Sequence, residues 1–395
     1  MRTVEEHQKI VAGLIKARAP QTLPIAETLG LVLAADIVAG LSLPGFDNSA
    51  MDGYAVLATD VAAATSDSPV QLPVAADIPA GRTDALTLEP GTAHRIMTGA
   101  PLPAGATAVV PVEATDGGTD TVTIRVAAPE GKHIRRAGED VTAGTVVLRA
   151  GQVLTAAALG LAAALGLAEL TVFPRQRVLV MSTGTELVAP GTPLQPGQIY
   201  ESNAVMLAAA VRDAGGEVVT STMCGDDVET FRAALAQHAG DADLIITTGG
   251  VSAGAYEVVK DSLSDHVEFV KVAMQPGMPQ GSGTVHGIPI ITLPGNPVSS
   301  LVSFEVFVRA PLRAAMGYPH AERPRRTAVL AEGLTSPPGK RQFRRGVLDG
   351  EHVTSYGPPA SHHLRWLASA NCLLEIGEDV TELSAGTPVP VWDLS

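Results

Sequence analysis

Short runs of β-branched and apolar residues alternate with helical patterns over the second half of the chain. The runs start near residues 177, 217, 244 and 288, and helical segments are expected over 204–214 and 298–309. Apolar runs without polar alternation are typical of strands that are buried on both faces of a sheet. Their alternation with helices predicts a three-layer α/β/α domain with a parallel-rich sheet.

The sharpest junction in this region is the stretch from Thr248 to Ser252. A buried strand stops there on Gly249 and Gly250, and a helix is expected to follow as far as Lys260. A strand that breaks on glycines and opens a helix presents several backbone N–H groups to one point, which predicts an anion site. An ordinary strand-to-helix turn, in which glycine only supplies backbone freedom, explains the same residues.

Two other predicted strands of this domain end in similar turns. Thr183 and Gly184 follow the first strand, and Pro294, Gly295, Asn296 and Pro297 follow the last. Because parallel strands end at the same edge of a sheet, the three strand ends are expected to converge there. Ligands of open α/β sheets bind at this edge.

Several polar residues are expected to begin helices. Thr3 and Glu6 have the spacing of a capping box, which predicts an amphipathic first helix. Asn203 is expected to cap the helix over 204–214, and Asp226 the following helix, with Glu229 three residues on. Asp226 therefore has a structural explanation beside any functional one.

The first third of the chain predicts a small β-domain, a barrel or a sandwich, from short strands between residues 70 and 126. A dense polar turn that includes Asp47 and Asp52 precedes a strand at 54–56. Such a turn can aim a carboxylate into a cleft, or its side chains can bond their own backbone. Thr98, before Gly99, is either a ligand-binding hydroxyl or an ordinary strand end.

Basic residues cluster twice in a chain that is otherwise acidic. Lys132, His133, Arg135 and Arg136 lie within five positions, and Arg136 can grip a phosphate or simply be solvated. A second basic cluster spans 340–345, inside a further small β-domain that short strands predict from residue 327 onward.

Composition narrows the classes of function. The formal net charge of −14 disfavours a general role with nucleic acid or anionic membranes. Two distant cysteines, Cys224 and Cys372, form neither a zinc spacing nor a disulfide framework, and no signal peptide is visible, which fits a cytoplasmic protein. The apolar stretch 154–173 predicts a small-residue helix of about 10–12 residues, well short of the roughly 20 that a membrane span needs.

The candidate chemistry is that of positioning and charge stabilisation around an anion. Carboxylates stand in or near the expected loops: Asp52, Glu186, Asp226, Asp227 and Glu257. A few of them sharing Mg²⁺ would suit a phosphate-bearing substrate, since Mg²⁺ takes oxygen ligands and keeps waters and substrate phosphates. The sequence contains no Walker lysine loop, no H-E-x-x-H motif and no convincing Ser-His-Asp elbow.

With these motifs in place, the chain resembles the molybdopterin molybdenumtransferase family and is similar to the E-domain of gephyrin. Seven motifs carry the resemblance in family order over nearly the whole chain: SAMDGYAV at 49–56, RIMTGAPLP at 95–103, IRRAGEDV at 134–141, STGTEL at 182–187, TGGVS at 248–252, LPGNPV at 293–298 and RRGV at 344–347.

The resemblance implies an elongated homodimer with four domains per subunit. One is a discontinuous α+β dimerisation domain of 1–45 plus 140–173, into which a small β-domain of 46–139 is inserted. An α/β molybdopterin-binding domain of 174–322 follows, and 323–395 forms a C-terminal β-barrel.

It also implies the reaction, in which adenylylated molybdopterin and molybdate give molybdenum cofactor and AMP with a divalent cation. Asp52, Thr98, Glu186 and Asp226 then take the catalytic positions, and Glu186, Asp226 and Glu257 hold the metal. Substrate binding falls to Arg136 and to the α/β loops at Thr183, Gly184, Gly249, Gly250, Ser252, Glu257 and 294–297, and the site completes across the dimer. The molybdopterin adenylyltransferase and apo-molybdoenzymes are the implied protein partners.

The chain departs from the family pattern near one strand. Where the family often has Lys-Pro-Gly-Lys-Pro, this chain has Gln275, Met278 and no local lysine, and Gln280-Gly-Ser-Gly283 replaces Phe-x-Phe-Gly. A second hypothesis is therefore a non-catalytic or specialised pterin-binding or scaffolding paralogue. A third is the adenylyltransferase itself, against which the additional domains argue.

Overall fold

The computed structural model describes residues 1–251 and 258–395, which divide into two compact units. The large unit comprises residues 1–35, 151–155 and 169–395, and the small unit comprises 36–150 and 156–168. Each unit has its own hydrophobic clusters.

A six-stranded sheet in the order β16-β13-β17-β21-β20-β18 forms the centre of the large unit. Its strands are β13 (Arg177–Thr183), β16 (Glu217–Cys224), β17 (Leu244–Thr248), β18 (Val267–Lys271), β20 (Pro279–Val285) and β21 (Ile288–Leu293). The first four strands of that order run parallel, whereas β20 and β18 are antiparallel. The predicted parallel-rich sheet is confirmed, with an antiparallel edge that the sequence did not predict.

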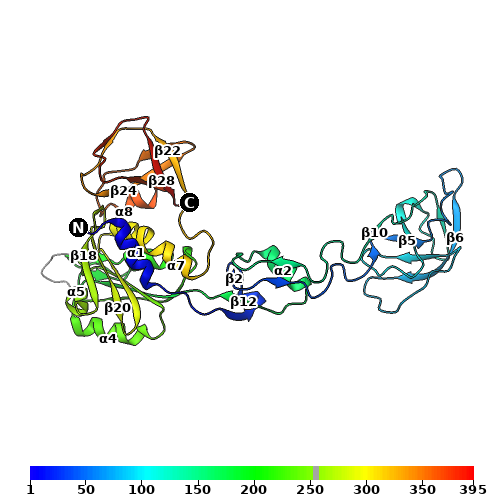
Figure 1. Cartoon of the computed structure of the whole chain (residues 1–395), viewed down its shortest axis with the longest axis horizontal. Helices are drawn as coiled ribbons and strands as arrows, with labels where there is room; N and C mark the ends of the chain where they lie inside the picture. The colour runs from blue at the N-terminus through cyan, green and yellow to red at the C-terminus, as the bar shows by residue number, and fades with distance from the viewer. Residues whose placement is uncertain (252–257) are drawn as a thin grey trace. The chain divides into compact units, whose positions relative to one another are not determined.

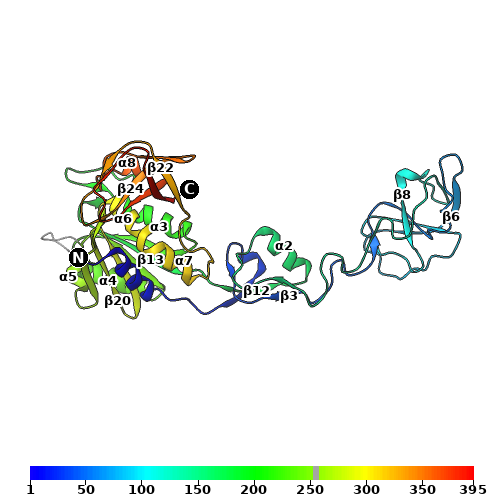
Figure 2. The same cartoon turned by 45° about the horizontal axis from the view of Figure 1, so that its top comes forward.

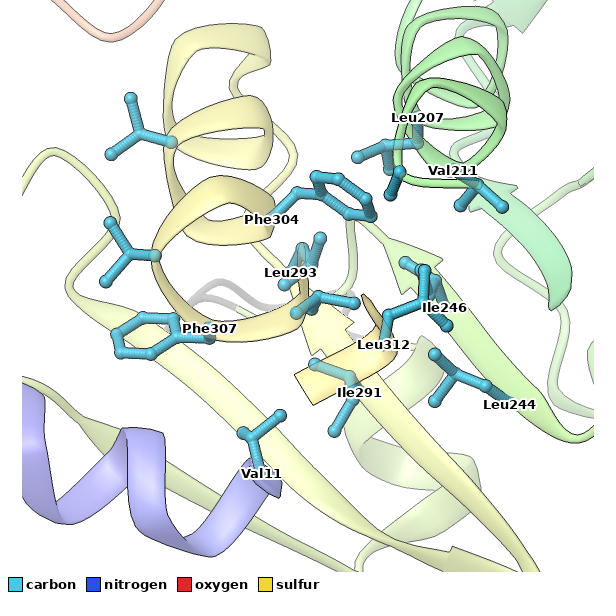
Figure 3. Close-up of a cluster of buried hydrophobic side chains, with 14 of the residues drawn as sticks. Val11, Leu207, Val211, Leu244, Ile246, Ile291, Leu293, Phe304, Phe307 and Leu312 are labelled. Carbon is cyan, nitrogen blue, oxygen red and sulfur yellow. The ribbon is translucent and has the colours of Figure 1, made fainter. Parts of the chain in front are cut away.

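Helices cover both faces of this sheet, which gives the predicted three layers (Figures 1 and 2). On one face lie α1 (Val4–Leu14), α3 (Asn203–Asp213), α6 (Pro297–Ser303) and α7 (Arg309–Ala315), with one π-helical turn, η3 (Phe304–Val308), joining the last two. On the other lie α4 (Val228–Ala239) and α5 (Val258–Leu263). Figure 3 shows the first face, where Leu207 of α3 and Phe304 of η3 meet Ile246 and Leu293.

The N-terminal helix α1 packs into this same core through Val4 and Val11. Its capping box is present as predicted, because the Thr3 hydroxyl accepts from the Glu6 N–H and the Glu6 carboxylate accepts from the Thr3 N–H. The large unit also contains a three-stranded sheet in the order β1 (Gln21–Pro24), β12 (Glu169–Phe173) and β2 (Val32–Leu33).

A closed five-stranded barrel follows the α/β domain. Hydrogen bonds run around the ring β24-β25-β22-β28-β26 and back to β24. The strands are β22 (Arg325–Leu330), β24 (Arg341–Asp349), β25 (His352–Ser355), β26 (Cys372–Ile376) and β28 (Pro388–Asp393). The short strand β19 (Met274–Gln275) of the preceding domain also pairs with β24, which joins the α/β domain to the barrel and confirms the predicted C-terminal fold.

The small unit contains one mixed sheet in the order β8-β5-β7-β6-β9, with apolar clusters on both faces. Its strands are β5 (Gly53–Val56), β6 (Val70–Ile78), β7 (Ala93–Ile96), β8 (Ala108–Pro111) and β9 (Thr121–Ile124). The sheet curls, because Thr115, just after β8, forms a bridge with Ile124 of β9, at the other end of the strand order, so the expected small β-domain is confirmed. Two short pairs, β4 (Asn48–Ser49) with β10 (Ile134–Arg135) and β3 (Ile37–Val38) with β11 (Val146–Leu148), belong to the same unit.

The apolar segment examined as a membrane span forms the helix α2 (Ala156–Ala164), and Gly166 follows it with a φ of 78° that suits a helix end. Within the described part of the chain, no helix has both the length and the apolar character needed to cross a bilayer.

Candidate functional site

The ends of β13, β17 and β21 lie side by side, as the sequence predicted. Ser182 is opposite Thr248, and Thr248 is opposite Leu293, in the parallel register of the sheet. The loops that follow are in close contact, because a Cβ added to Gly249 would lie 2.7 Å from the Thr183 carbonyl oxygen. A Cβ on Gly295 would lie 3.4 Å from the Gly249 Cα atom. Three backbone loops therefore meet at one point on the carboxyl edge of the sheet.

Glycine is required at the central loop for two reasons. Gly249 and Gly250 have φ values of 91° and 62°, a region that other residues adopt only with strain. A side chain on Gly250 would also approach the backbone nitrogen of Val259 in α5 to 3.0 Å. The two glycines thus allow the loop to pass between Thr183 and the start of the next helix.

Ser252 and Glu257, both predicted site residues, lie outside the described residues. Pro294 is buried and Gly295 is exposed, and Asn296 directs its side-chain amide to the Ser361 hydroxyl, 2.9 Å away. Pro297 is the first residue of α6. Asn296 therefore links this loop to the segment between β25 and β26, rather than capping α6 with its side chain.

The two acidic residues of this edge flank the loop after β13. The Asp226 carboxylate accepts from both the N–H and the hydroxyl of Thr185, each at 3.0 Å. The exposed Glu186 folds back over Gly184, since a Cβ there would lie 2.6 Å from its carboxylate. Both carboxylates are thus placed beside the segment 184–186.

The prediction that Asp226 caps the next helix is wrong. Asp227 is the cap of α4, and its carboxylate accepts from the Thr230 hydroxyl at 2.6 Å and from the Thr230 N–H at 2.8 Å. The hydroxyl bond, and then the backbone bond, lower the pKa of Asp227. A second capping prediction is also wrong, because Asn203 is the first residue of α3 and its side chain does not cap the helix. Neighbouring polar residues compete for one cap, and sequence spacing alone does not decide which of them takes it.

In the small unit, Asp52 and Thr98 are in direct contact. The Asp52 carboxylate accepts from the Thr98 N–H at 2.7 Å and from its hydroxyl at 2.8 Å. The backbone bond, and then the hydroxyl bond, lower the pKa of Asp52, so this exposed carboxylate is ionised at neutral pH. The Asp52 carboxylate is thus held by Thr98, which follows β7, and not only by the backbone of its own turn.

Arg136 forms an ion pair with Asp47 at 2.6 Å, and about half of its side chain remains exposed. The Asp47 carboxylate also accepts from the Ala137 N–H, and these bonds lower the pKa of Asp47. Only one guanidinium nitrogen of Arg136 is bonded to Asp47, so this half-exposed side chain fits both expectations, a solvated turn and a contact to an anion.

A pocket between the α/β domain and the barrel contains functional candidates that the sequence reasoning did not place in a site. It is lined by Gln275, Pro276, Gln342, Arg344, Arg345 and Tyr356, among others. Arg345 is buried and donates to the carbonyls of Pro358, Ala360 and His363, and burial lowers the pKa of both arginines. Among the described residues, the side-chain partners of Arg344 and Arg345 are backbone carbonyls and not carboxylates. Arg344 is half-buried and donates one bond to the Thr335 carbonyl, so neither positive charge is neutralised by a carboxylate, and an anionic ligand could supply the missing negative charge.

Gln275 lines this pocket and contributes no charge to it. Its side-chain oxygen accepts from the Gln342 amide at 2.6 Å, across the β19–β24 pair. Gly281 and Gly283, in the other departure from the family motif, lie in β20. A side chain at Gly281 would collide with the Thr292 hydroxyl, and one at Gly283 with the His266 carbonyl. These glycines serve close strand packing.

Within the described residues, no three histidine, cysteine, aspartate or glutamate side chains gather into a preformed metal site. Glu186 and Asp226 still suit a hard cation that arrives with substrate phosphates, because Mg²⁺ is usually held by one or two carboxylates plus those phosphates.

The comparisons with known proteins agree with this architecture. Residues 2–166 match the MoeA N-terminal region (domain I and II), 179–314 a probable molybdopterin binding domain, and 327–394 the MoeA C-terminal region (domain IV). The chain is 69% identical to molybdopterin molybdenumtransferase 2 of Mycobacterium tuberculosis, with 100% of both chains covered. It is 38% identical to molybdopterin molybdenumtransferase of Synechococcus elongatus, with 95% of each covered.

A crystal structure of the molybdopterin biosynthesis MoeA protein of Pyrococcus horikoshii is similar over 100% of this chain and 99% of that one, at a TM-score of 0.82 and 30% identity. The matching regions, the relatives and the fold lead to the same conclusion: the chain belongs to the MoeA family of molybdopterin molybdenumtransferases.

Proposed function

We propose that this chain transfers molybdenum from molybdate to adenylylated molybdopterin, releasing AMP and yielding molybdenum cofactor. The observation that carries the proposal is the meeting of the loops after β13, β17 and β21 at the carboxyl edge of the sheet. Ligands of open α/β sheets bind at this edge, so these loops suit the pterin and phosphate groups of the substrate. Thr183, Gly184, Gly249, Gly250, Ser252 and the loop 294–297 are the proposed pterin- and phosphate-binding residues.

We propose catalytic roles for Asp52, Thr98, Glu186 and Asp226. Asp52 and Asp226 each accept two bonds from a threonine, which holds their carboxylates in a fixed direction. Glu186, Asp226 and Glu257 are the proposed ligands of Mg²⁺, which would offset the negative charge of the phosphates when bound. Arg136 is the proposed additional contact to an anionic part of the substrate.

The pocket beside Gln275 supports catalysis over the alternative of a binding-only paralogue. Gln275 and Met278 lack the charges of the family's lysines, but Arg344 and Arg345 line the pocket that contains Gln275 and, among the described residues, bond to backbone carbonyls rather than to carboxylates. We propose that Arg344 contributes to binding molybdate there, because a desolvated guanidinium favours an oxyanion.

The wider setting is part of the same proposal. We propose a cytoplasmic homodimer that receives its substrate from the molybdopterin adenylyltransferase and passes its product to apo-molybdoenzymes. Both cysteines are free and buried, as expected in a reducing compartment. The proposed domains remain 1–45 with 140–173, 46–139, 174–322 and 323–395.

The experiment is a reconstitution with purified protein, adenylylated molybdopterin, Mg²⁺ and molybdate, in which AMP release is measured. Release that depends on molybdate, and that is lost in Asp52→Ala and Glu186→Ala variants, would support the transferase. Tight substrate binding without AMP release, with release gained only in a Gln275→Lys, Met278→Lys double variant, would instead support the binding-only paralogue.

A further inference from the structure

The side-chain amide of Asn203 connects two of the three loops that form the candidate anion site. Its nitrogen Nδ2 donates to the Gly295 carbonyl oxygen at 2.6 Å and to the Thr248 hydroxyl at 3.1 Å. The Thr248 hydroxyl in turn donates to the Pro294 carbonyl at 3.1 Å. Three hydrogen bonds therefore tie the end of β17 to the loop that follows β21.

The orientation of the amide follows from these contacts. A carbonyl oxygen 2.6 Å away accepts only from a donor, so the nitrogen rather than the oxygen of the side chain faces Gly295. The oxygen Oδ1 is buried, and among the described residues it meets no donor. Both bonds that the amide donates therefore go to the loops.

Asn203 is free for this task because another residue caps its helix. The carboxylate of Glu201, which is 6% exposed, accepts from the Ala204 N–H at 2.6 Å. This bond satisfies one of the N–H groups in the first turn of α3 that have no acceptor within the helix, so the Asn203 side chain is not needed there. Glu201 and Asn203 thus divide two functions: one stabilises the helix, and the other reaches the loops.

The bond to Gly295 also fixes the direction of a neighbouring donor. The peptide between Gly295 and Asn296 is trans, because the two cis peptides among the described residues precede Pro44 and Pro276. In a planar trans peptide the N–H points away from the carbonyl oxygen. Holding the Gly295 carbonyl toward Asn203 therefore directs the Asn296 N–H away from Asn203 and restricts the conformation of this loop.

We propose that Asn203 is a positioning residue for molybdenum transfer, holding the loops at Thr248 and Gly295 at the spacing that the phosphate and pterin of the substrate require. This inference rests on the proposed function, because it assigns the substrate to these loops. It goes beyond a structural role for Asn203 in α3, since that role belongs to Glu201.

The test is the Asn203→Asp variant, which has nearly the same shape but places a carboxylate oxygen against the Gly295 carbonyl. The KM for adenylylated molybdopterin should rise about tenfold, which corresponds to the loss of about one hydrogen bond of roughly 1.4 kcal/mol. The kcat should change less than threefold, because a contact that only orders the binding loops acts on the ground state and the transition state alike.

Two further readouts separate positioning from structure. Lowering the pH protonates the introduced carboxyl, which can then donate to the Gly295 carbonyl again, so the KM ratio of variant to wild type should fall toward one. The matched control is Glu201→Gln, which weakens the cap of the same helix without touching the loops. It should lower the melting temperature and leave the KM unchanged.

The outcomes are distinct. A raised KM in N203D, recovered at low pH and absent in E201Q, supports the inference. Wild-type activity together with an unchanged KM in N203D, or an equal rise in E201Q, overturns it and leaves the proposed function intact. A wild-type protein that neither binds the substrate nor releases AMP overturns the proposed function and, with it, this inference.

Discussion

The Asp52 carboxylate accepts two hydrogen bonds from a single residue, one from the N–H of Thr98 at 2.7 Å and one from its hydroxyl at 2.8 Å. The large unit repeats this arrangement, where Asp226 accepts the same two bonds from Thr185. A carboxylate held at one oxygen by two donors cannot rotate freely and leaves its other oxygen for a cation or a substrate donor. Both acidic side chains are thus fixed before any ligand arrives.

Asp226 and Asp227 form a natural pair for separating catalysis from stability. Asp226→Asn should lower AMP release by roughly 100-fold or more, on the scale of losing a group that stabilises the transition state, with little change in stability. Asp227→Ala is the control, because alanine removes the helix cap whereas asparagine would keep part of it. The Asp227→Ala variant should lose about 1 kcal/mol of unfolding free energy and keep its activity. AMP-release assays and urea unfolding measure the two effects. Equal losses of activity in both variants would contradict the assignment.

Gly249→Ala should disrupt the point where the three loops meet. The new methyl group would lie 2.7 Å from the Thr183 carbonyl oxygen at a φ of 91°, and the expected cost is about 1–3 kcal/mol of unfolding free energy with weakened substrate binding. Gly240→Ala is the control, because a Cβ there meets nothing within 4 Å and the φ is −60°. Thermal unfolding and substrate titration of both variants provide the measurement. Unchanged binding in Gly249→Ala would argue against a site at these loops.

Arg344→Gln should raise the KM for molybdate by roughly tenfold to a hundredfold, because one charge-assisted hydrogen bond contributes about 1.5–3 kcal/mol. The KM for adenylylated molybdopterin should stay within twofold of the wild-type value if the pocket beside Gln275 binds only the oxyanion. Arg326→Gln removes an exposed arginine of the same barrel, which pairs with Asp393, and should leave both constants unchanged. Steady-state AMP release against molybdate concentration distinguishes the variants, and a molybdate KM unaffected in Arg344→Gln would place the oxyanion elsewhere.

His7 should make the protein less stable in mild acid. The ring is fully buried against Phe307, and burial lowers the pKa of His7 to about 4 from an ordinary value near 6.5. Between these two pKa values His7 is protonated in the unfolded chain and neutral in the folded chain. The free energy of unfolding therefore falls as the pH drops from about 6.5 toward 4. The loss approaches 3 kcal/mol, since each pKa unit corresponds to about 1.4 kcal/mol.

Urea unfolding at pH 7 and pH 5 measures this effect. The His7→Leu variant should lose less stability between these two pH values than the wild type, because leucine takes up no proton. A variant as sensitive to acid as the wild type would assign the pH dependence to other groups.

The sheet could be predicted from the sequence because its central strands are continuous apolar runs. The antiparallel strand β20 could not, because Pro279, Gly281 and Gly283 interrupt the pattern that marks a strand. Those glycines are explained only in three dimensions, where β20 passes close to Thr292 and His266.

The candidate site was predicted in part for the same reason. Strand order alone brings Thr183, Gly249 and Gly295 to one edge, so their convergence follows from local patterns. The pocket beside Gln275 depends on β19 pairing with β24, an association of distant segments that no local pattern encodes. The basic cluster at 340–345 was the one local signal available. The two helix-cap predictions were wrong because neighbouring polar residues can each bond the first turn of a helix. Asp227 rather than Asp226 does so in α4, and Glu201 rather than Asn203 does so in α3.

The most direct test of the central claim is a single reaction that couples two products. Purified protein, adenylylated molybdopterin and Mg²⁺ are mixed with limiting molybdate, and AMP is quantified alongside the activation of an apo-molybdoenzyme. The account predicts one AMP per molybdenum transferred, with activation that rises in step and that disappears in Asp226→Asn. AMP release that is independent of molybdate, or activation without AMP, would contradict molybdenum transfer by this chain.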